Sequence, residues 1–252
     1  MGLDFIMNNY NPKQKKGANT MNISKQVAFV TGANRGLGRQ LTLELLSRGA
    51  KVYAGARNPE TIDIPGVTPV KLDVTNPQEV AAAASLAKDV TLLINNAGSS
   101  TGASLLEGDL AKIQLEMDTH FFGTLSMVRA FAPVIENNGG GTVLNILSVL
   151  SWFSGGNAGA YTAAKAAAWA LTNDLRLNLY PRQIRVAGLH VGFMETDMTA
   201  GLDAPKSNPS DVARMAIDGI ESGSFEILAD DNSRMIQAGL SGGVATLYPH
   251  LS

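Results

Sequence analysis

Three side chains between residues 148 and 165 have the types and spacing needed to protonate a carbonyl oxygen. If the run Tyr161-Thr-Ala-Ala-Lys165 is helical, its phenol and ammonium stand one turn apart on the same face. A nearby cation favours the phenolate, so we expect Lys165 to lower the pKa of Tyr161 from about 10 toward working pH. Ser148 follows an expected strand at 142–147 and can hydrogen-bond the same oxygen. Because Tyr-x-x-x-Lys pairs also occur by chance on solvated helices, the elements that position these residues decide the interpretation.

A glycine-rich segment near the start of the chain predicts a dinucleotide site. Residues 31–38 (TGANRGLG) join the first expected strand to the first helical pattern. Gly32 suits a tight turn, Gly36 lets a pyrophosphate approach the backbone, and Gly38 lets the helix pack closely with its first amides facing the anion. A purely structural turn is the alternative, and the strand, loop and helix context favours the dinucleotide.

The end of the second expected strand, at 51–57, indicates which cofactor binds. An acidic side chain there would bind the ribose 2′-hydroxyl of NAD, and this chain has none at that point. It has Arg57 there and Arg35 inside the glycine-rich segment. Two guanidinium groups suit a 2′-phosphate through forked, charge-assisted hydrogen bonds, although either arginine alone could be merely solvated. Their joint position predicts NADP(H).

Two further strand ends suit the adenosine half of such a cofactor. Asp73 ends an expected strand at 67–74 and could accept a hydrogen bond from the adenine amino group, or equally serve as a turn or N-cap carboxylate. Residues 95–98 (NNAG) follow an apolar run at 90–94 that is typical of a central parallel strand. Their small side chains would let the adenosine lie against backbone, and Asn95 can hydrogen-bond across neighbouring strands.

The rest of the chain continues the alternation of strands and helices. Asn76, Pro77 and Glu79 form a capping-box pattern that opens an alanine-rich helix. Long helical patterns at 109–136 and 160–180 have more apolar surface than one sheet covers, which favours packing on a partner subunit. The expected strands lie at 25–30, 51–57, 67–74, 90–94, 142–147, 183–189 and 225–228. The sequence therefore predicts an α/β fold, a Rossmann-type doubly wound sheet of roughly seven parallel strands with helices on both faces.

Composition excludes several classes of protein. The chain has 252 residues, 45% of them hydrophobic and 17% charged, with a net charge of −2, which is ordinary for a soluble globule and does not suggest nucleic-acid binding. It has no cysteine and three histidines, so we expect neither disulfides nor a metal site. Residues 1–21 hold no signal-peptide core and no membrane span, and we interpret them as a mobile tail before a single domain at 22–252. We expect a cytoplasmic protein with no membrane partner.

Taken in order, these pieces resemble the classical short-chain dehydrogenase/reductase (SDR) family from about Lys25 to Leu228. The motifs that carry the resemblance fall at family spacing, and they are Thr31-Gly-x-x-x-Gly-x-Gly38, Asp73, Asn95-Asn-Ala-Gly98, Ser148, Tyr161-x-x-x-Lys165 and Thr196. The resemblance implies a Rossmann-type subunit, usually tetrameric, that moves a hydride between a nicotinamide and a carbonyl or alcohol.

The resemblance also implies roles for individual residues. Tyr161 matches the general acid/base, and Ser148 matches the hydroxyl that polarises the carbonyl. Lys165 matches the residue that holds the nicotinamide ribose and lowers the tyrosine pKa, and Thr196 matches the carboxamide contact. The implied cofactor-binding residues, which include the basic pair of NADP-preferring members, are Gly32, Arg35, Gly36, Leu37, Gly38, Arg57, Asp73, Val74, Asn95, Ala97, Gly98, Tyr161, Lys165, Val191 and Thr196.

Three positions depart from the family pattern. Where the family has a catalytic Asn in an Asn-x-x-Gly signature, this chain has His120-Phe-Phe-Gly. The family Asn holds a water that links the catalytic lysine to solvent, so His120 either takes that role or is a packed histidine satisfied by a backbone carbonyl. The usual Ser-Ser is Leu-Ser148, which keeps the catalytic serine, and the usual Pro-Gly is Val191-Gly, which removes no reactive group.

We expect an NADPH-dependent oxidoreductase that reversibly reduces small to medium hydrophobic ketones or aldehydes, with Tyr161 as general acid. A 3-oxoacyl-acyl-carrier-protein reductase ranks lower, because residues 130–164 contain no Lys or Arg to dock an acidic carrier. A non-catalytic NADP(H)-binding sensor or scaffold is the alternative of another class, favoured by the altered Asn. The residues expected to line an apolar substrate pocket, each of which could instead be ordinary core, are Trp152, Phe153, Phe193 and Met194.

Overall fold

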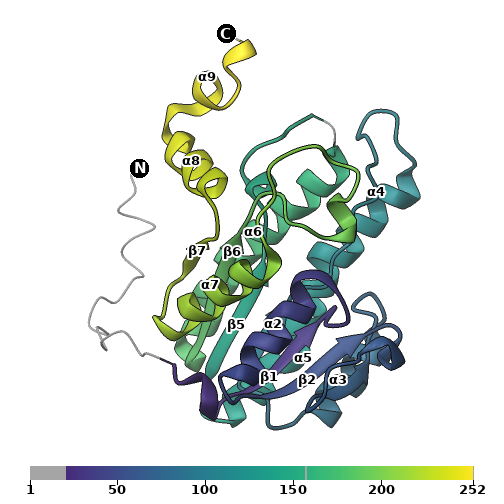
Figure 1. The fold of residues 1–252 in the computed structure, drawn as a ribbon, viewed down its shortest axis with the longest axis vertical. Coiled ribbons are helices and arrows are strands. Elements are labelled where there is room, and N and C mark those ends of the chain that lie inside the picture. The colour runs from purple at the N-terminus through teal and green to yellow at the C-terminus, as the bar shows by residue number, and fades with distance from the viewer. Residues whose placement is uncertain (1–20, 157, 252) are drawn as a thin grey trace.

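The computed structural model describes residues 21–156 and 158–251, and its strands form one parallel sheet (Figure 1). In these ranges the seven strands follow the order β3-β2-β1-β4-β5-β6-β7, and every neighbouring pair is parallel. The order reverses between β1 and β4, where a doubly wound sheet opens a crevice at the carboxyl ends of its strands. The predicted Rossmann-type α/β sheet is confirmed. Its strands are β1 (Val27–Thr31), β2 (Lys51–Ala56), β3 (Thr68–Lys71), β4 (Leu92–Asn95), β5 (Gly141–Ile146), β6 (Ile184–His190) and β7 (Glu226–Leu228).

Helices cover both faces of the sheet because successive residues of each buried strand point to opposite sides. Val30 packs into the core under α2 (Gly36–Ser47) and α7 (Pro209–Glu221). Its neighbour Phe29 packs into the other core, under α3 (Pro77–Leu86), α5 (Thr124–Asn137) and α6 (Gly159–Leu179). After β7, the short helices α8 (Asp231–Gly239) and α9 (Gly243–Leu247) lead away from the sheet (Figure 1). None of the helices in the described ranges is long and apolar enough to cross a membrane.

The long helical segment predicted at 109–136 forms, but it contains a change of helix type. It begins as α4 (Leu110–Met117), continues as the π-helical turn η3 (Asp118–Gly123) and ends as α5. A π turn holds one more residue than an α turn and often occurs at functional sites. The histidine that departs from the family pattern, His120, lies in this turn.

The predicted cap of α3 is confirmed in part. Asn76 is the N-cap residue, and its side chain accepts hydrogen bonds from the amides of Gln78 and Glu79, with Pro77 at the first helical position. The reciprocal half of the capping box is wrong. The Glu79 carboxylate accepts from the Asp73 amide at 2.7 Å, because the turn at 73–76 brings that amide within its reach.

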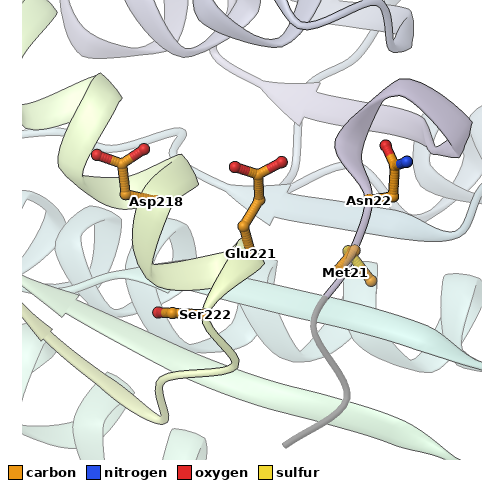
Figure 2. Close-up of a pocket in the computed structure, with 5 residues that line it drawn as sticks. All are labelled: Met21, Asn22, Asp218, Glu221 and Ser222. Atoms are coloured by element: carbon orange, nitrogen blue, oxygen red, sulfur yellow. The ribbon is translucent and has the colours of Figure 1, made fainter.

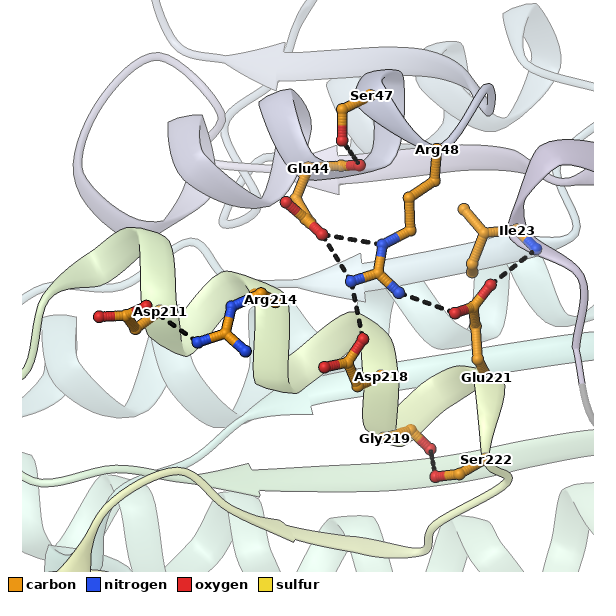
Figure 3. A network of polar contacts seen from close by, with 10 residues as sticks. All are labelled: Ile23, Glu44, Ser47, Arg48, Asp211, Arg214, Asp218, Gly219, Glu221 and Ser222. Carbon is orange, nitrogen blue, oxygen red and sulfur yellow. Dashed lines mark hydrogen bonds and ion pairs between the residues drawn. The ribbon is translucent and has the colours of Figure 1, made fainter.

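A charged clamp joins the two helices on the first face (Figure 3). Arg48, the C-cap residue of α2, lies 2.7 Å from carboxylate oxygens of both Asp218 and Glu221 on α7, and its Nε donates to Glu44 at 2.8 Å. Partly buried ion pairs that share one guanidinium are better oriented than isolated surface pairs. The clamp holds the carboxyl end of α2 against the carboxyl end of α7.

A surface hollow of about 600 Å³ lies beside this clamp and is lined by Met21, Asn22, Asp218, Glu221 and Ser222 (Figure 2). Asn22 precedes β1 and Ser222 precedes β7, so the hollow is at the amino ends of the strands, opposite the expected cofactor crevice. Met21 donates its amide to the Glu221 carbonyl at 3.1 Å. The other residues of the predicted tail, 1–20, lie outside the described ranges, and the division into tail and single domain stays a prediction.

Candidate active site

Ser148, Tyr161 and Lys165 come together where β5 ends and α6 begins. Ser148 caps the short turn η4 (Val149–Ser151), and its hydroxyl oxygen accepts from the Leu150 amide at 3.2 Å. Lys165 donates to the Ile146 carbonyl at 2.8 Å, and its ammonium lies 5.5 Å from the centre of the Tyr161 ring. The lysine and the serine are each 5% exposed. Three groups predicted from spacing therefore share one buried corner at the carboxyl edge of the sheet.

Burial sets the proton affinities of this corner. It raises the pKa of Tyr161 above its ordinary value, opposed by a side-chain hydrogen bond with Ser148 and reinforced by the charge of Glu116. The predicted lowering of this pKa is wrong for the structure described here, because desolvation of the phenolate is the largest influence. Burial also lowers the pKa of Lys165 to about 8, opposed by the Glu116 charge. The lysine can therefore exchange a proton near neutral pH.

The glycine-rich loop has the conformation that close backbone approach requires. Gly32 has a φ of +64°, a left-handed conformation that favours glycine. A Cβ on Gly38 would overlap the Gly32 carbonyl oxygen and the Asn96 side-chain nitrogen, so no larger residue fits there. Gly36 lies opposite Thr196, since a Cβ added at Gly36 would stand 3.4 Å from the threonine methyl carbon. Loop and threonine thus face each other at the start of α2.

The two predicted cofactor arginines are both exposed but differ in their contacts. Arg35 is the N-cap residue of α2, and its guanidinium lies 3.0 Å from the Asp197 carboxylate, with side-chain exposures of 68% and 78%. Arg57 directly follows β2 and has no ion pair with the residues that the structure describes. Both arginines lie at the carboxyl edge of the sheet. Of the two, Arg35 has an ion pair within the described residues and Arg57 has none.

Polar side chains tie the strand ends together on the adenosine side of the crevice. The Asp73 carboxylate accepts from both the amide and the hydroxyl of Thr75, so the turn interpretation holds in this structure. Asn95 donates to Asn145 on the neighbouring strand at 2.8 Å, which confirms the predicted cross-strand bond. The amide of Ala97 donates to the Thr31 hydroxyl at 2.9 Å. The remaining predicted cofactor contacts that lie beside these loops are Leu37, Val74, Gly98 and Val191.

His120 enters the same corner from the π turn. It is 3% exposed, and its ring packs edge-on to Tyr161 with the ring centres 5.2 Å apart. Its Nε2 lies 2.8 Å from the carbonyl oxygen of Ser99. Burial lowers the pKa of His120, as does the charge of Lys165, while Glu116 acts in the opposite direction. The histidine is packed against a backbone carbonyl, as one alternative predicts, and its ring lies edge-on to Tyr161. The relay alternative stays a prediction.

Two pairs, each of one glutamate and one buried histidine, were not predicted from the sequence. Glu116 is fully buried and lies 3.3 Å from His120, and their spacing of four residues on a helical pattern is a signal that could have revealed the pair. Glu226 on β7 lies 2.9 Å from His190 on β6, and no sequence signal links them. The His190 ring in turn faces the Ser148 carbonyl, with Nδ1 at 3.2 Å. Both pairs therefore border the catalytic corner.

The expected pocket residues divide between core and surface. Trp152 is half-buried and stacks on His190 with ring centres 3.6 Å apart, so packing on that histidine occupies one face of its ring. Phe153 stacks on Tyr248 from the C-terminal segment at 5.2 Å, and the Tyr248 hydroxyl accepts from the Ser154 amide. Phe193 is 41% exposed, and Met194 packs against the core beneath α7. Of the four, Phe193 is the residue most available to a ligand.

Comparisons with known proteins agree with this geometry. The family model described as short chain dehydrogenase matches residues 26–207. An oxidoreductase of Staphylococcus saprophyticus is 27% identical over 77% of this chain and 91% of its own length. The NADPH-dependent 1-acyldihydroxyacetone phosphate reductase of Schizosaccharomyces pombe is 31% identical over 69% of this chain and 61% of its own length.

A solved structure gives the same assignment. A short chain dehydrogenase from Burkholderia cenocepacia, crystallised in complex with NADP, superposes with a TM-score of 0.88 at 40% sequence identity, covering 92% of this chain and 99% of that one. The family match extends over the glycine-rich loop, the catalytic corner and all strands but β7. The chain is therefore an oxidoreductase of the short-chain dehydrogenase family.

Proposed function

We propose that this chain is an NADPH-dependent reductase of small to medium hydrophobic ketones or aldehydes, working reversibly, with Tyr161 as general acid. The observation that carries the proposal is the convergence of Ser148, Tyr161 and Lys165 in one buried corner beside the glycine-rich loop. Ser148 and Tyr161 would both hydrogen-bond the substrate oxygen. Tyr161 would give that oxygen a proton, which stays on the alcohol product, and Lys165 would supply a replacement proton to the phenolate.

The residues at the crevice fit a phosphorylated dinucleotide. The loop at Gly32 and Gly38 leaves room only for backbone, and the first amides of α2 are available to an anion. At the expected ribose end, Arg57 has no ion pair with the described part of the chain. NADPH, when bound there, supplies the hydride. The Burkholderia cenocepacia relative binds NADP and the Schizosaccharomyces pombe relative is NADPH-dependent, which supports the same choice.

Arg57 gives the sharpest test of cofactor choice. A desolvated, charge-assisted contact to the 2′-phosphate contributes about 1.5–3 kcal/mol, or roughly ten- to hundredfold in affinity. Arg57→Asp should therefore lose most of the preference for NADPH over NADH, measured as the ratio of the two kcat/KM values. Equal kcat/KM for both cofactors in the wild type, or an unchanged ratio in Arg57→Asp, would refute the assignment.

NADPH oxidation, followed over a panel of carbonyl compounds, tests the reaction. The panel includes aliphatic and aromatic ketones, aldehydes, 3-oxoacyl carrier protein and 1-acyldihydroxyacetone phosphate. We expect turnover of the neutral hydrophobic compounds, because residues 130–164 offer no cation for an acidic carrier or a phosphate. Tyr161→Phe should bind NADPH and lose turnover. A wild type that binds NADPH but oxidises it no faster than Tyr161→Phe would instead be the non-catalytic sensor or scaffold.

We also propose a homo-oligomer, most simply a tetramer, in the cytoplasm. The π turn and α5 expose apolar side chains, among them Phe122 at 51%, beside a hollow of about 400 Å³ against α3. Apolar helix faces of this kind are commonly buried by closed symmetry between subunits. Light scattering at micromolar concentration tests this, and a monomer would contradict it.

A further inference from the structure

Glu116 is a buried carboxylate that joins three parts of the catalytic corner. It is 0% exposed, and one of its oxygens accepts from the Ser99 hydroxyl at 2.9 Å while the other accepts from the Thr101 amide. Its third neighbour is Nε2 of His120 at 3.3 Å. Burial alone would raise the pKa of this carboxyl, but hydrogen bonds from His120, Thr101 and Ser99 outweigh it and hold the pKa below its ordinary value. Glu116 therefore stays anionic inside the protein.

The neighbours of His120 select which ring nitrogen carries the proton. Nε2 faces the Ser99 carbonyl oxygen at 2.8 Å and the Glu116 carboxylate at 3.3 Å, both of which only accept. The Ser99 amide is also near, at 3.3 Å, but the shortest contact is to the carbonyl. The neutral ring is thus protonated at Nε2. Its other nitrogen, Nδ1, keeps its lone pair, since the hydrogen bonds and the ion pair of this ring among the described residues all involve Nε2.

The charges that act on this ring come from two helices. Glu116 on α4 raises the proton affinity of His120, and Lys165 on α6 lowers it. Tyr161 on α6 contacts the ring edge and is neutral under ordinary conditions. The same carboxylate raises the proton affinity of both Lys165 and Tyr161. One buried anion thus influences every proton-bearing group of the corner except Ser148.

We propose that Glu116 is a positioning residue of the reductase, which holds His120 by Nε2 so that Nδ1 is the atom that exchanges protons with the Lys165 side of the site. This rests on the proposed reductase function and extends it. Each turnover consumes one proton from solvent. Tyr161 protonates the alkoxide oxygen, and Lys165 replaces the proton that Tyr161 has lost. Solvent water then protonates the free Nδ1 of His120, and Nδ1 passes that proton to the neutral amine of Lys165, which returns the ring to its form protonated at Nε2 alone. Glu116 keeps its charge throughout and touches none of the reacting atoms.

The variant Glu116→Gln tests the role of the charge, with Glu136→Gln on α5 as the matched control outside the site. We expect kcat to fall about tenfold or more with the KM for NADPH nearly unchanged. Loss of the anion lowers the pKa of His120 and of Lys165, so the alkaline limb of the kcat profile should move to lower pH. In a His120→Asn background no imidazole remains to be oriented. Adding Glu116→Gln to that variant should therefore lower kcat little further.

Nitrogen NMR of the histidines gives a readout that does not depend on turnover. The chain has three histidines, and His120→Asn identifies the signal of His120. Wild type should show the Nε2-protonated tautomer, and Glu116→Gln should show a lower titration midpoint for that ring. A wild-type ring protonated at Nδ1 would overturn the proposal, as would a folded Glu116→Gln with the wild-type pH profile. An inactive wild type that shows the predicted tautomer would refute the reductase function while leaving the pairing intact.

Discussion

The two buried histidines beside the catalytic corner differ in how many of their ring nitrogens are occupied. His190 is held on both: Nδ1 faces the Ser148 carbonyl at 3.2 Å, and Nε2 lies 2.9 Å from Glu226, at ion-pair distance though without ideal hydrogen-bond alignment. His120 is held on Nε2 alone. Both neighbours of the His190 nitrogens are acceptors, and Trp152 stacks on the face of the ring with ring centres 3.6 Å apart, so the ring is packed on both edges and on a face.

The carboxylates of the two pairs differ as well. Glu226 also pairs with Arg176, whose guanidinium lies 2.9 Å away. This carboxylate therefore has a cationic partner other than the histidine. Besides His120, the hydrogen-bond partners of Glu116 within the described ranges are a hydroxyl and an amide, and none of them is a second cation. A histidine held on both sides supports the strand ends beneath Ser148. Under the proposal above, a histidine held on one side keeps a nitrogen available for proton exchange, so the two pairs would serve packing in one place and chemistry in the other.

The largest expected effect is on stability, in His190→Ala. This variant removes a buried stacking surface and leaves Glu226 with Arg176 alone, so the free energy of unfolding should fall by about 2–4 kcal/mol. Urea unfolding measures the change. The folded fraction should keep a kcat close to that of the wild type. Normal stability together with a hundredfold loss of kcat would reverse the roles assigned to the two histidines.

The next effect is on catalysis, in His120→Ala. If Nδ1 relays protons, kcat should fall by about 10²-fold or more, the range of acid and base groups, while NADPH affinity stays nearly unchanged. The loss of stability should be smaller than in His190→Ala. His120→Asn should retain substantial activity, because asparagine is the residue of the family pattern. Wild-type kcat and pH profile in a folded His120→Ala would leave only Ser148, Tyr161 and Lys165 as the catalytic set.

A smaller effect is expected in the acid dependence of stability. Burial would raise the pKa of Glu226, but its close contacts with His190 and Arg176 hold that pKa below its ordinary value. A carboxylate whose pKa is lower in the folded than in the unfolded chain stabilises the fold at any pH above its unfolded pKa of about 4.3. This stabilisation is lost as the pH falls through the pKa of the folded chain. Glu226→Gln should therefore flatten the fall in unfolding free energy below about pH 5, by on the order of 1 kcal/mol. Parallel curves for the wild type and the variant would contradict this.

The smallest change in the free energy of unfolding is expected when an exposed ion pair is removed. Arg182 lies 2.6 Å from Glu136, with side-chain exposures of 34% and 45%. Exposed pairs contribute about 0.2–1 kcal/mol. Glu136→Gln should thus change the free energy of unfolding by less than about 1 kcal/mol and leave kcat unchanged. If Glu136→Gln lowered the free energy of unfolding as much as His190→Ala, burial would not explain why the buried pair contributes more than the exposed pair.

Sequence reasoning succeeded where a local pattern carries the information. Short β-prone runs between glycine loops and helical patterns predicted the strands, and the spacing of Tyr161 and Lys165 predicted that both would reach the corner near Ser148. It failed where contacts between segments far apart in the sequence decide the structure. The pairing of His190 with Glu226 depends on the register of β6 against β7, in which Gly188 is aligned with Glu226. The pKa of Tyr161 depends on burial, which the spacing of charges does not reveal.

The same reasoning missed Glu116, although its spacing from His120 was visible. A pair four residues apart has the same pattern on a solvated helix face as inside the protein. What buries this pair is the loop at 99–101, which supplies the Ser99 and Thr101 donors and is separate in sequence. The π turn that aims His120 has no sequence signature that we recognised.

The π turn at Asp118–Gly123 also limits how this part of the chain can vary. Each residue of an α-helix rotates the chain by about 100°, and the π turn acts as one extra residue whose rotation has been absorbed locally. Because the extra residue is accommodated inside the turn, each half keeps its own buried contacts: Glu116 and His120 face the 99–101 loop, and Met127 and Phe131 lie in the core under α5. Deleting one residue would convert the turn into continuous α-helix and leave both halves in register. The deletion would instead change the backbone at the turn itself, so the length of this stretch controls the position of the His120 ring more than it controls the packing of the two helices.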